Sequence, residues 1–381
     1  MVLDYALSWG GAQPGGGMSK RWRFGVGTLV VLTLLVGGAW LMRGAIAVAL
    51  VKRAYATAMR GDPIADMPDG LSVGLCGSGS PMPDPTRAGP CVAVVAGHQL
   101  FIVDTGPGST RRLALMRLPP ADVSAVFLTH FHSDHIGDLG ELMLQRWGGG
   151  AATAPLPIYG PTGVDQVVAG FNEAYSLDRG YRVAHHGPKV MPPSGAAGAA
   201  HAFAISKTGP NVLVLSEPNL QVIAFPVDHE PVEPAVGYLF IYKGRRLVVS
   251  GDTAPCPRLE AAARGADVLV HEGLAPNLVA IQHDAAVKAG KWNIAAVTHD
   301  ILSYHSSPEA AAGIAQRAGV RYLLFDHIIP PLPTTALDGP FLGRAPQIYH
   351  GPIRVGQDGD FVSISAATGE ISYTNRLHLV W

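Results

Sequence analysis

The sequence predicts a layered α/β sandwich over residues 70–381, preceded by a membrane-spanning helix near the N-terminus. Two observations lead to this expectation. Short β-branched runs alternate with helical or loop stretches through the larger part of the chain, without detectable repeats. Ahead of them, one apolar run is long enough to cross a bilayer as a helix. Hydrophobic residues make up 48% of the chain, which is ample for a sizeable core.

The membrane-spanning segment is predicted at Phe24–Met42, which holds 19 residues and no charge. A helix needs about 20 apolar residues to span a bilayer. Residues 1–23 are interpreted as a leader, and the basic residues at its end resemble the start of a secretory signal. A cleavable signal peptide, cut near Ala45–Ala47, is therefore the alternative. An uncleaved anchor is favoured because the run exceeds the usual apolar core of a signal peptide.

The orientation of this segment follows less directly from the sequence. Basic residues flank the apolar run on both sides, so the charge rule for membrane orientation is nearly balanced. We expect a single-pass protein of a bacterial-type cell membrane, with the domain that follows periplasmic or extracellular. Residues 43–69, which end in a polar, proline-containing joint, are predicted to be a linker.

Three cysteines, Cys76, Cys91 and Cys256, are too few for a disulfide framework and lack zinc-finger spacing. A bridge between Cys76 and Cys91 is one interpretation, if the domain is outside the cytoplasm. Two free buried thiols are the other, because free cysteine packs well as a small apolar residue.

Strands are predicted where β-branched and apolar residues form short runs. One helix is predicted over Pro257–Arg264, with its proline in the first turn. A second is predicted to be capped by Ser306, with Glu309 in capping-box position, and to run through Ala310–Arg317 to a stop near Gly319. The predicted strands are Leu71–Leu75, Cys91–Val95, Leu100–Val103, Ala125–Leu128, Val222–Phe225, Tyr238–Tyr242, Leu247–Val249, Val268–Val270 and Tyr322–Phe325.

The segment with the clearest chemistry is Thr129–His135, which directly follows an apolar strand and holds four metal-capable side chains in six residues. A lone histidine is most often an ordinary core or surface residue, but such a cluster is hard to explain as packing. Alternation along an extended chain puts His130 and His132 on one side, and the turn that follows can aim Asp134 and His135 at a second point. Imidazole and carboxylate groups suit zinc, and paired metals need ligands interleaved in this way.

This H-x-H-x-D-H pattern resembles that of the metallo-β-lactamase superfamily, and the resemblance covers roughly residues 70–330. It implies a four-layer αββα metallo-β-lactamase sandwich with two Zn²⁺ ions, or Mn²⁺ in their place. In the family, the aspartate that matches Asp104 orients the metal loop without binding metal. The resemblance implies one metal held by His130, His132 and His229, a second held by Asp134, His135 and His327, and Asp252 as the bridge between them.

The positions of these residues support convergence independently of the resemblance. Each candidate ligand lies just beyond the carboxyl end of an apolar run. Crevices outside the carboxyl ends of strands are where α/β sheets typically hold ligands. All seven side chains can therefore meet on one rim of the sheets.

Further motifs resemble the ribonuclease Z and zinc-arylsulfatase branch of this superfamily. In that branch, the histidine of the last motif acts with a glutamate as the proton donor to the leaving group. The resemblance thus implies His305, supported by Glu272, as general acid, while Asp134 orients the attacking water. A solvent-facing His305 and a structural Glu272 are the alternatives. The matching motifs are Gly74–Pro81, Pro157–Pro161, Gly237–Tyr238, Ser250–Cys256, Val270–Glu272 and His305–Ser307.

Four observations argue against tRNA processing. After His327 the chain reads IIPP, where the ribonuclease would carry S-x-R-Y. An insertion at residues 171–207, predicted to be a lid or dimer arm, holds few basic residues, although nucleic-acid affinity comes largely from phosphate neutralisation. The whole chain has 28 Lys+Arg against 29 Asp+Glu, without the basic balance of a dedicated nucleic-acid binder. An exported domain would also not meet tRNA.

We therefore expect a membrane-anchored di-zinc hydrolase that cleaves phosphodiester or sulfate ester bonds of small molecules through a metal-bridged hydroxide. A homodimer is a further expectation. The alternatives are a ribonuclease Z-type endonuclease that processes tRNA 3′ ends, and a lactone or thioester hydrolase on the same metal core. A non-catalytic binding module is disfavoured because all seven ligands are present.

Overall fold

The computed structural model describes residues 20–59 and 61–377, and the chain divides into two units between Asp62 and Pro63. The first unit contains helix α1 (Lys20–Ala58). Among the described residues, α1 is the one helix that is long and apolar enough to cross a membrane, a test that a signal sequence also passes. Most of the predicted leader, residues 1–19, lies outside the described residues.

Helix α1 extends beyond the predicted span Phe24–Met42 and takes in residues 43–58 of the predicted linker. The helix continues because this stretch is rich in alanine and contains no proline, so no backbone hydrogen bond is interrupted before Pro63. Whether α1 spans a membrane stays a prediction.

The second unit is built on two mixed β-sheets, an eight-stranded one and a seven-stranded one within the described residues. In sheet order, the first holds β15 (Ile371–Asn375), β14 (Asp360–Ser365), β1 (Gly70–Gly77), β2 (Cys91–Ala96), β3 (Gln99–Val103), β4 (Val123–Phe127), β5 (Leu156–Pro161) and β6 (Gly198–Phe203). The second holds β13 (Ile353–Val355), β12 (Leu323–Ile329), β11 (Val268–Leu274), β10 (Arg245–Val249), β9 (Val236–Tyr242), β8 (Leu220–Pro226) and β7 (Val212–Glu217).

Alternation along the strands decides which core each side chain enters. In β2, Val92 and Val94 belong to the core between the sheets, while Ala93 and Val95 belong to the core on the outer face. Strands β10, β11 and β12 divide their side chains between two cores in the same way. Both faces of these strands are covered, which is why they appear in the sequence as continuous apolar runs.

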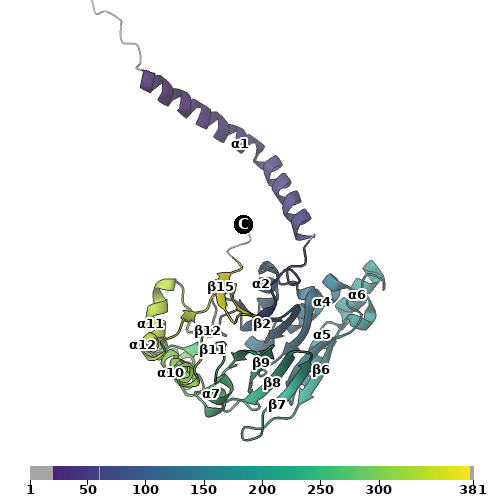
Figure 1. Ribbon diagram of the computed structural model, residues 1–381, viewed down its shortest axis with the longest axis vertical. Coiled ribbons are helices and arrows are strands. Elements are labelled where there is room, and N and C mark those ends of the chain that lie inside the picture. Colours follow the sequence, from purple (N-terminus) through teal and green to yellow (C-terminus); the bar gives the residue numbers. More distant parts are fainter. Residues whose placement is uncertain (1–19, 60, 378–381) are drawn as a thin grey trace, which may run out of the picture. The chain divides into compact units, whose positions relative to one another are not determined.

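Helices cover the outer face of each sheet, which completes the αββα order of layers. Helices α2 (Ser109–Leu115), α4 (Leu139–Gly150) and α5 (Val164–Ala174) contribute to the outer core of the first sheet. Helices α7 (Pro257–Ala263), α10 (Pro308–Ala318), α11 (Asp338–Leu342) and α12 (Ala345–Ile348) contribute to that of the second. Figure 1 shows α10 and α12 beside β11 and β12, with α4 and α5 on the other side of the molecule.

Every predicted strand overlaps a strand of the structure, and six further strands were not predicted: β5, β6, β7, β13, β14 and β15. The insertion at residues 171–207 contains regular secondary structure. It contains α6 (Ser176–His186) and also β6, which pairs with β5 as the edge of the first sheet. Within the insertion, Tyr175 packs closely on Gly140 of α4. A Cβ atom added to Gly140 would lie 2.2 Å from the Tyr175 ring. The role of the insertion stays a prediction.

The start of α10 differs from the predicted capping box. Its N-cap is Ser307, whose side chain accepts a hydrogen bond from the amide of Ala310. Ser306 instead donates its hydroxyl to the carbonyl of Thr253, 2.7 Å away. Glu309 pairs with Arg344 and does not complete the box. Ser306 therefore ties the helix to the loop that follows β10.

The structure joins Cys76 of β1 to Cys91 of β2 in a disulfide, with 5.0 Å between their Cα atoms. Both residues are buried, and Cys256 is free. Of the two interpretations left open by the sequence, the structure has the bridge.

Candidate metal centre

The centre forms where strands of both sheets end. Asp104 follows β3, the Thr129–His135 loop follows β4, His229 follows β8 and Asp252 follows β10. Strands β3 and β4 are parallel, and β8 and β10 are both antiparallel to β9, so within each sheet these ends lie at the same edge. The amide of Val236 donates to the carbonyl of Thr129 at 3.0 Å, which ties the two edges together.

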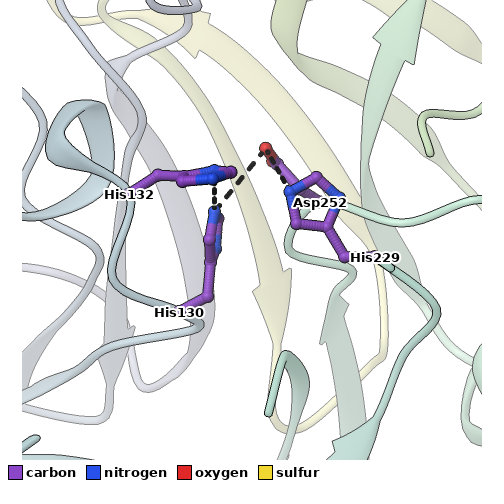
Figure 2. A group of neighbouring side chains, drawn as sticks. All are labelled: His130, His132, His229 and Asp252. Carbon is purple, nitrogen blue, oxygen red and sulfur yellow. Dashed lines mark hydrogen bonds and ion pairs between the residues drawn. The ribbon is translucent and has the colours of Figure 1, made fainter. Parts of the chain in front are cut away.

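One group of four candidate ligands contains His130, His132, His229 and Asp252 (Figure 2). Their ligand atoms all lie within 4.8 Å of one another. Nε2 of His130 and Nδ1 of His132 are 3.0 Å apart, so these two ring nitrogens face each other. Three of the four residues are buried, and His132 is exposed. This donor set is one that zinc prefers.

A second group contains Asp134, His135 and His327, all buried. Oδ2 of Asp134 lies 3.4 Å from Nε2 of His135 and 3.3 Å from Nε2 of His327. Asp134 and His135 come from the short helix α3 (Ser133–Ile136), whereas His327 comes from β12 on the other sheet. The group therefore closes the gap between the two sheet edges.

Asp252 is shared by the two groups. Its Oδ2 atom lies 3.3 Å from Nε2 of His135 and of His327, and 3.9 Å from Nε2 of His130 and of His229. One carboxylate oxygen thus faces four imidazoles. This is the position that a ligand shared between two metal ions would need.

The unpartnered atoms at the centre fit a divalent metal. Four buried side-chain atoms here have no hydrogen-bond partner among the described residues. Buried polar groups are nearly always satisfied, so a cluster of unsatisfied ones points to a missing ligand. They are Nε2 of His135, Nε2 of His229 and Oδ1 of Asp252, together with Nδ1 of His327, whose ring turns its other nitrogen, Nε2, toward Asp134 and Asp252.

Local backbone geometry aims two of the residues. His327 does not end its strand as predicted but lies inside β12, where the pairing passes from Glu272–Asp326 to Gly273–Ile328. His327 is therefore the extra residue of a bulge, with φ at 43°, and bulges beside active sites re-aim side chains. Asp104 also has a positive φ, 59°, which is uncommon outside glycine.

Neighbouring groups orient the histidines. Asp104 accepts hydrogen bonds from Nδ1 of His135 and from the amide and hydroxyl of Thr129, at 2.7–2.8 Å. Nδ1 of His229 donates to the carbonyl of Tyr304 at 3.0 Å, which leaves Nε2 to face the cluster. Such partners fix the ring and its tautomer. The contribution of Tyr304 comes from a backbone carbonyl, so no sequence pattern could have revealed it.

Electrostatics divides the histidines into two sets. Burial lowers the pKa of His130, of His132 and of His229, the last to about 4. Burial also opposes the protonation of His135 and His327. For these two, the charge of Asp252 and hydrogen bonds to carboxylates outweigh burial, so the pKa of His135 is raised and that of His327 reaches about 9. The imidazoles of His130, His132 and His229 are thus neutral. Those of His135 and His327, in the second group, are protonated and paired with carboxylates when no metal is bound.

His305 and Glu272 lie together beside the second group. Nδ1 of His305 is 3.2 Å from Oε1 of Glu272, which also accepts from the amides of Ser306 and Thr253. His305 stacks on His327 with 5.4 Å between the ring centroids. Burial lowers the pKa of His305 to about 4 and raises that of Glu272. Neither is solvent-facing, so that interpretation of His305 is wrong.

Other histidines noted in the sequence lie away from the centre. His185 and His186 are exposed at the end of α6. His283 lies between α8 (Pro276–Lys288) and α9 (Trp292–Asp300), where Nδ1 contacts the carbonyl of Ala295. His299 pairs with the neighbouring Asp300 on the surface.

A cavity of about 880 Å³ opens directly beside the centre. His132, Asp134, Asp252, His305 and His327 form one part of its lining. The rest comes from the Ser80–Pro83 loop, from α8, α9 and the residues just after each, and from the end of β12 with Pro331 after it. Pockets of 300–1,000 Å³ are typical of small-molecule sites. The cavity was not predicted, because its walls join segments far apart in the sequence.

Comparison with known proteins agrees with this geometry. Residues 100–328 match the beta-lactamase superfamily domain. A protein named ribonuclease Z from Mycobacterium avium is 37% identical over 78% of this chain and 99% of its own length. Another of that name from Mycobacterium bovis is 38% identical over 76% of this chain and 96% of its own. The crystal structure of human tRNase Z, short form, has the same fold, with a TM-score of 0.55 and 20% identity over 77% of this chain and 99% of that one.

Proposed function

The chain belongs to the beta-lactamase superfamily, within its ribonuclease Z-like branch, and from this premise we propose that it hydrolyses phosphodiester bonds with the help of divalent metal. The observation that carries the proposal is the position of Asp252, whose carboxylate faces four imidazoles from both sheets. We propose two zinc ions as the metals, with manganese as a substitute, held by the two ligand groups with Asp252 between them.

Bound metal would acidify a water molecule and polarise the scissile group. The protein's own residues would do the rest. Asp134 lies in the cavity wall, where its carboxylate can orient the attacking water. His305 is held by Glu272 and can deliver a proton from Nε2 to the leaving oxygen. Burial disfavours the protonated form of His305, and the negative charge that develops on the leaving oxygen would counteract this.

Endonucleolytic processing of tRNA 3′ ends is the second candidate, and the relatives favour it. Two proteins named ribonuclease Z match over nearly their whole length. The relatives reported above give no such support to sulfate ester or lactone hydrolysis. Against tRNA stands the cavity lining, in which Lys291 is the one lysine or arginine among the described residues.

For location, we propose that the domain lies outside the cytoplasm, anchored by α1. The Cys76–Cys91 disulfide supports this, because disulfides are rare in the cytosol. The length and composition of α1 agree with an anchor. Alkaline phosphatase fused after Trp381 would be active under this proposal, and an inactive fusion with an active cytoplasmic reporter would reject it. The homodimer stays a prediction.

The central experiment uses the full chain in detergent, loaded with zinc or manganese. We expect hydrolysis of bis-p-nitrophenyl phosphate, with the Asp134→Ala variant as the blank. Absence of hydrolysis with either metal fully bound would reject the proposal. Precursor tRNA and p-nitrophenyl sulfate, assayed on the same preparation, separate the two alternative substrates. Faster turnover of precursor tRNA than of every small diester would make the second candidate the function.

A further inference from the structure

Apart from the candidate ligands, apolar side chains form much of the lining of the cavity beside the metal centre. The larger ones include those of Met82, Ile294, Val297, Ile301, Ile329 and Pro331, and uncharged polar ones come from Gln282, Asn293 and Thr298. Small residues, Ala285 and Ala286 of α8 and Ala289 just after it, are also in the lining. A site for a phosphate backbone would need several cations at this place.

The floor of the cavity is a fixed part of the fold. Ile301 and Ile329 belong to a small hydrophobic cluster with Leu274 and Val279, against which Met82 also packs. Ile329 is in β12, two residues after His327, so the apolar floor begins where the ligands end. The floor and the metal centre therefore hold a constant spacing.

The wall of the cavity is an exposed apolar face of α9. Ile294 and Val297 are three residues apart in α9, which places them on one side of the helix. Ile294 is 54% exposed and Val297 is 53% exposed. Apolar side chains that line a cavity while exposed to water lose that exposure when an apolar group occupies it.

We propose that the cavity binds an apolar arm, alkyl or aryl, of an amphiphilic diester whose phosphate lies at the metal centre. The proposal rests on the proposed function and names its substrate class. The floor formed by Ile301 and Ile329 takes the end of the arm, and the α9 wall covers its length. Lys291, the one lysine or arginine among the described residues of the lining, is available to a polar group at the rim.

The test compares methyl, butyl and octyl p-nitrophenyl phosphate, below their aggregation limits, on the metal-loaded full chain. Burying one methylene group favours binding by about fourfold when burial is complete. Because one wall is open, we expect kcat/KM to rise by roughly 10- to 100-fold from methyl to octyl. A flat series over the three diesters would overturn the proposal and leave phosphodiester hydrolysis intact.

Two variants of the same hairpin locate the effect. Val297→Asp puts a charge in the wall and should reduce the octyl-to-methyl ratio at least tenfold. Ile281→Asp makes the same kind of change on α8 at a residue that is 65% exposed and outside the lining, so the ratio should stay. Both side chains are exposed, so we expect both variants to fold. Equal ratios in the two variants would count against the α9 wall as the binding surface.

A binding measurement separates the proposed apolar site from the proposed hydrolytic function. Methyl-, butyl- and octylphosphonate are titrated by calorimetry into the same preparation. Tighter binding along the series together with no hydrolysis of any diester would reject the proposed function and keep the apolar site. Equal affinities would reject the apolar site, whatever the activity.

Discussion

The carboxylate of Asp104 accepts a hydrogen bond from Nδ1 of His135 at 2.8 Å, so a residue outside the candidate ligand groups decides which nitrogen of that imidazole faces the centre. The same carboxylate holds Thr129 by two further hydrogen bonds. One side chain thus fixes both ends of the ligand loop. It can do so because its backbone adopts a left-handed conformation at the end of β3.

Asp104→Asn should weaken metal binding without unfolding the domain. The amide oxygen can still accept from the backbone amide of Thr129, but an NH₂ group replaces the oxygen that accepts from Nδ1 of His135 and from the Thr129 hydroxyl. Partners of this kind are worth roughly 10- to 100-fold in metal affinity. Chelator competition measures the loss, with the exposed Asp165→Asn as the control. Wild-type affinity in Asp104→Asn would mean that His135 is oriented by other contacts.

Metal affinity should rise with pH at the Asp134, His135 and His327 group. Without metal, the pKa of His327 is about 9 and that of His135 is raised, so metal must displace protons from both near neutral pH. Affinity should increase up to about tenfold per pH unit for each displaced proton, and level off above about pH 9.

The histidines of the other group have lowered pKa values and are already neutral at pH 7. The first metal equivalent should therefore bind at lower pH and with little proton release. Titration in weakly buffered solution at pH 7, with pH recorded after each addition, distinguishes the two steps. Equal proton release in both steps would contradict the division of the histidines.

His305→Ala should affect diesters according to their leaving group. Protonation matters little for p-nitrophenolate, which is stable as an anion, but greatly for an alkoxide. We expect a loss of roughly 10²- to 10⁴-fold in kcat with alkyl leaving groups and a much smaller loss with p-nitrophenyl. Glu272→Gln should show the same pattern in weaker form, because it acts through His305. A uniform loss for both leaving groups would assign His305 to substrate or metal binding.

Asp358→Ala should destabilise the second unit by about 1–3 kcal/mol. The buried carboxylate of Asp358 accepts from the amides of Ser78 and Ala88, and its loss leaves both donors unsatisfied. Asp178→Ala removes an exposed ion pair with Arg182 and should leave the free energy of unfolding nearly unchanged. Chemical denaturation of the two variants provides the comparison, and equal stability would contradict it.

Reduction of the disulfide should lower the stability of the domain. The bridged cysteines are 15 residues apart, and closing such a loop contributes about 3 kcal/mol. Thermal unfolding with and without dithiothreitol measures the change. The Cys76→Ser/Cys91→Ser double variant should have the Tm of the reduced protein, and dithiothreitol should not change that Tm. The Cys256→Ser variant should behave as wild type.

The sequence by itself determined the ligand types, the strands that carry them and the order of layers. A strand followed by H-x-H-x-D-H is a local pattern, and residues at such spacing are constrained to lie close together whatever the rest of the chain does. The apolar runs of β10, β11 and β12 likewise predicted strands, and the structure buries both faces of these strands. The roles given to the seven ligands, to His305 and to Glu272 remain predictions, although the structure brings all nine side chains together.

Only the tertiary structure decided the rest. The bulge that turns His327 inward, the Tyr304 carbonyl that holds His229, and the cavity between α9 and β12 all depend on contacts between distant segments. Periodicity reports which face of an element is apolar, but not which element will cover it. The exposed face of α9 shows this limit, because only its position beside the ligands makes Ile294 and Val297, two ordinary apolar residues, part of a site.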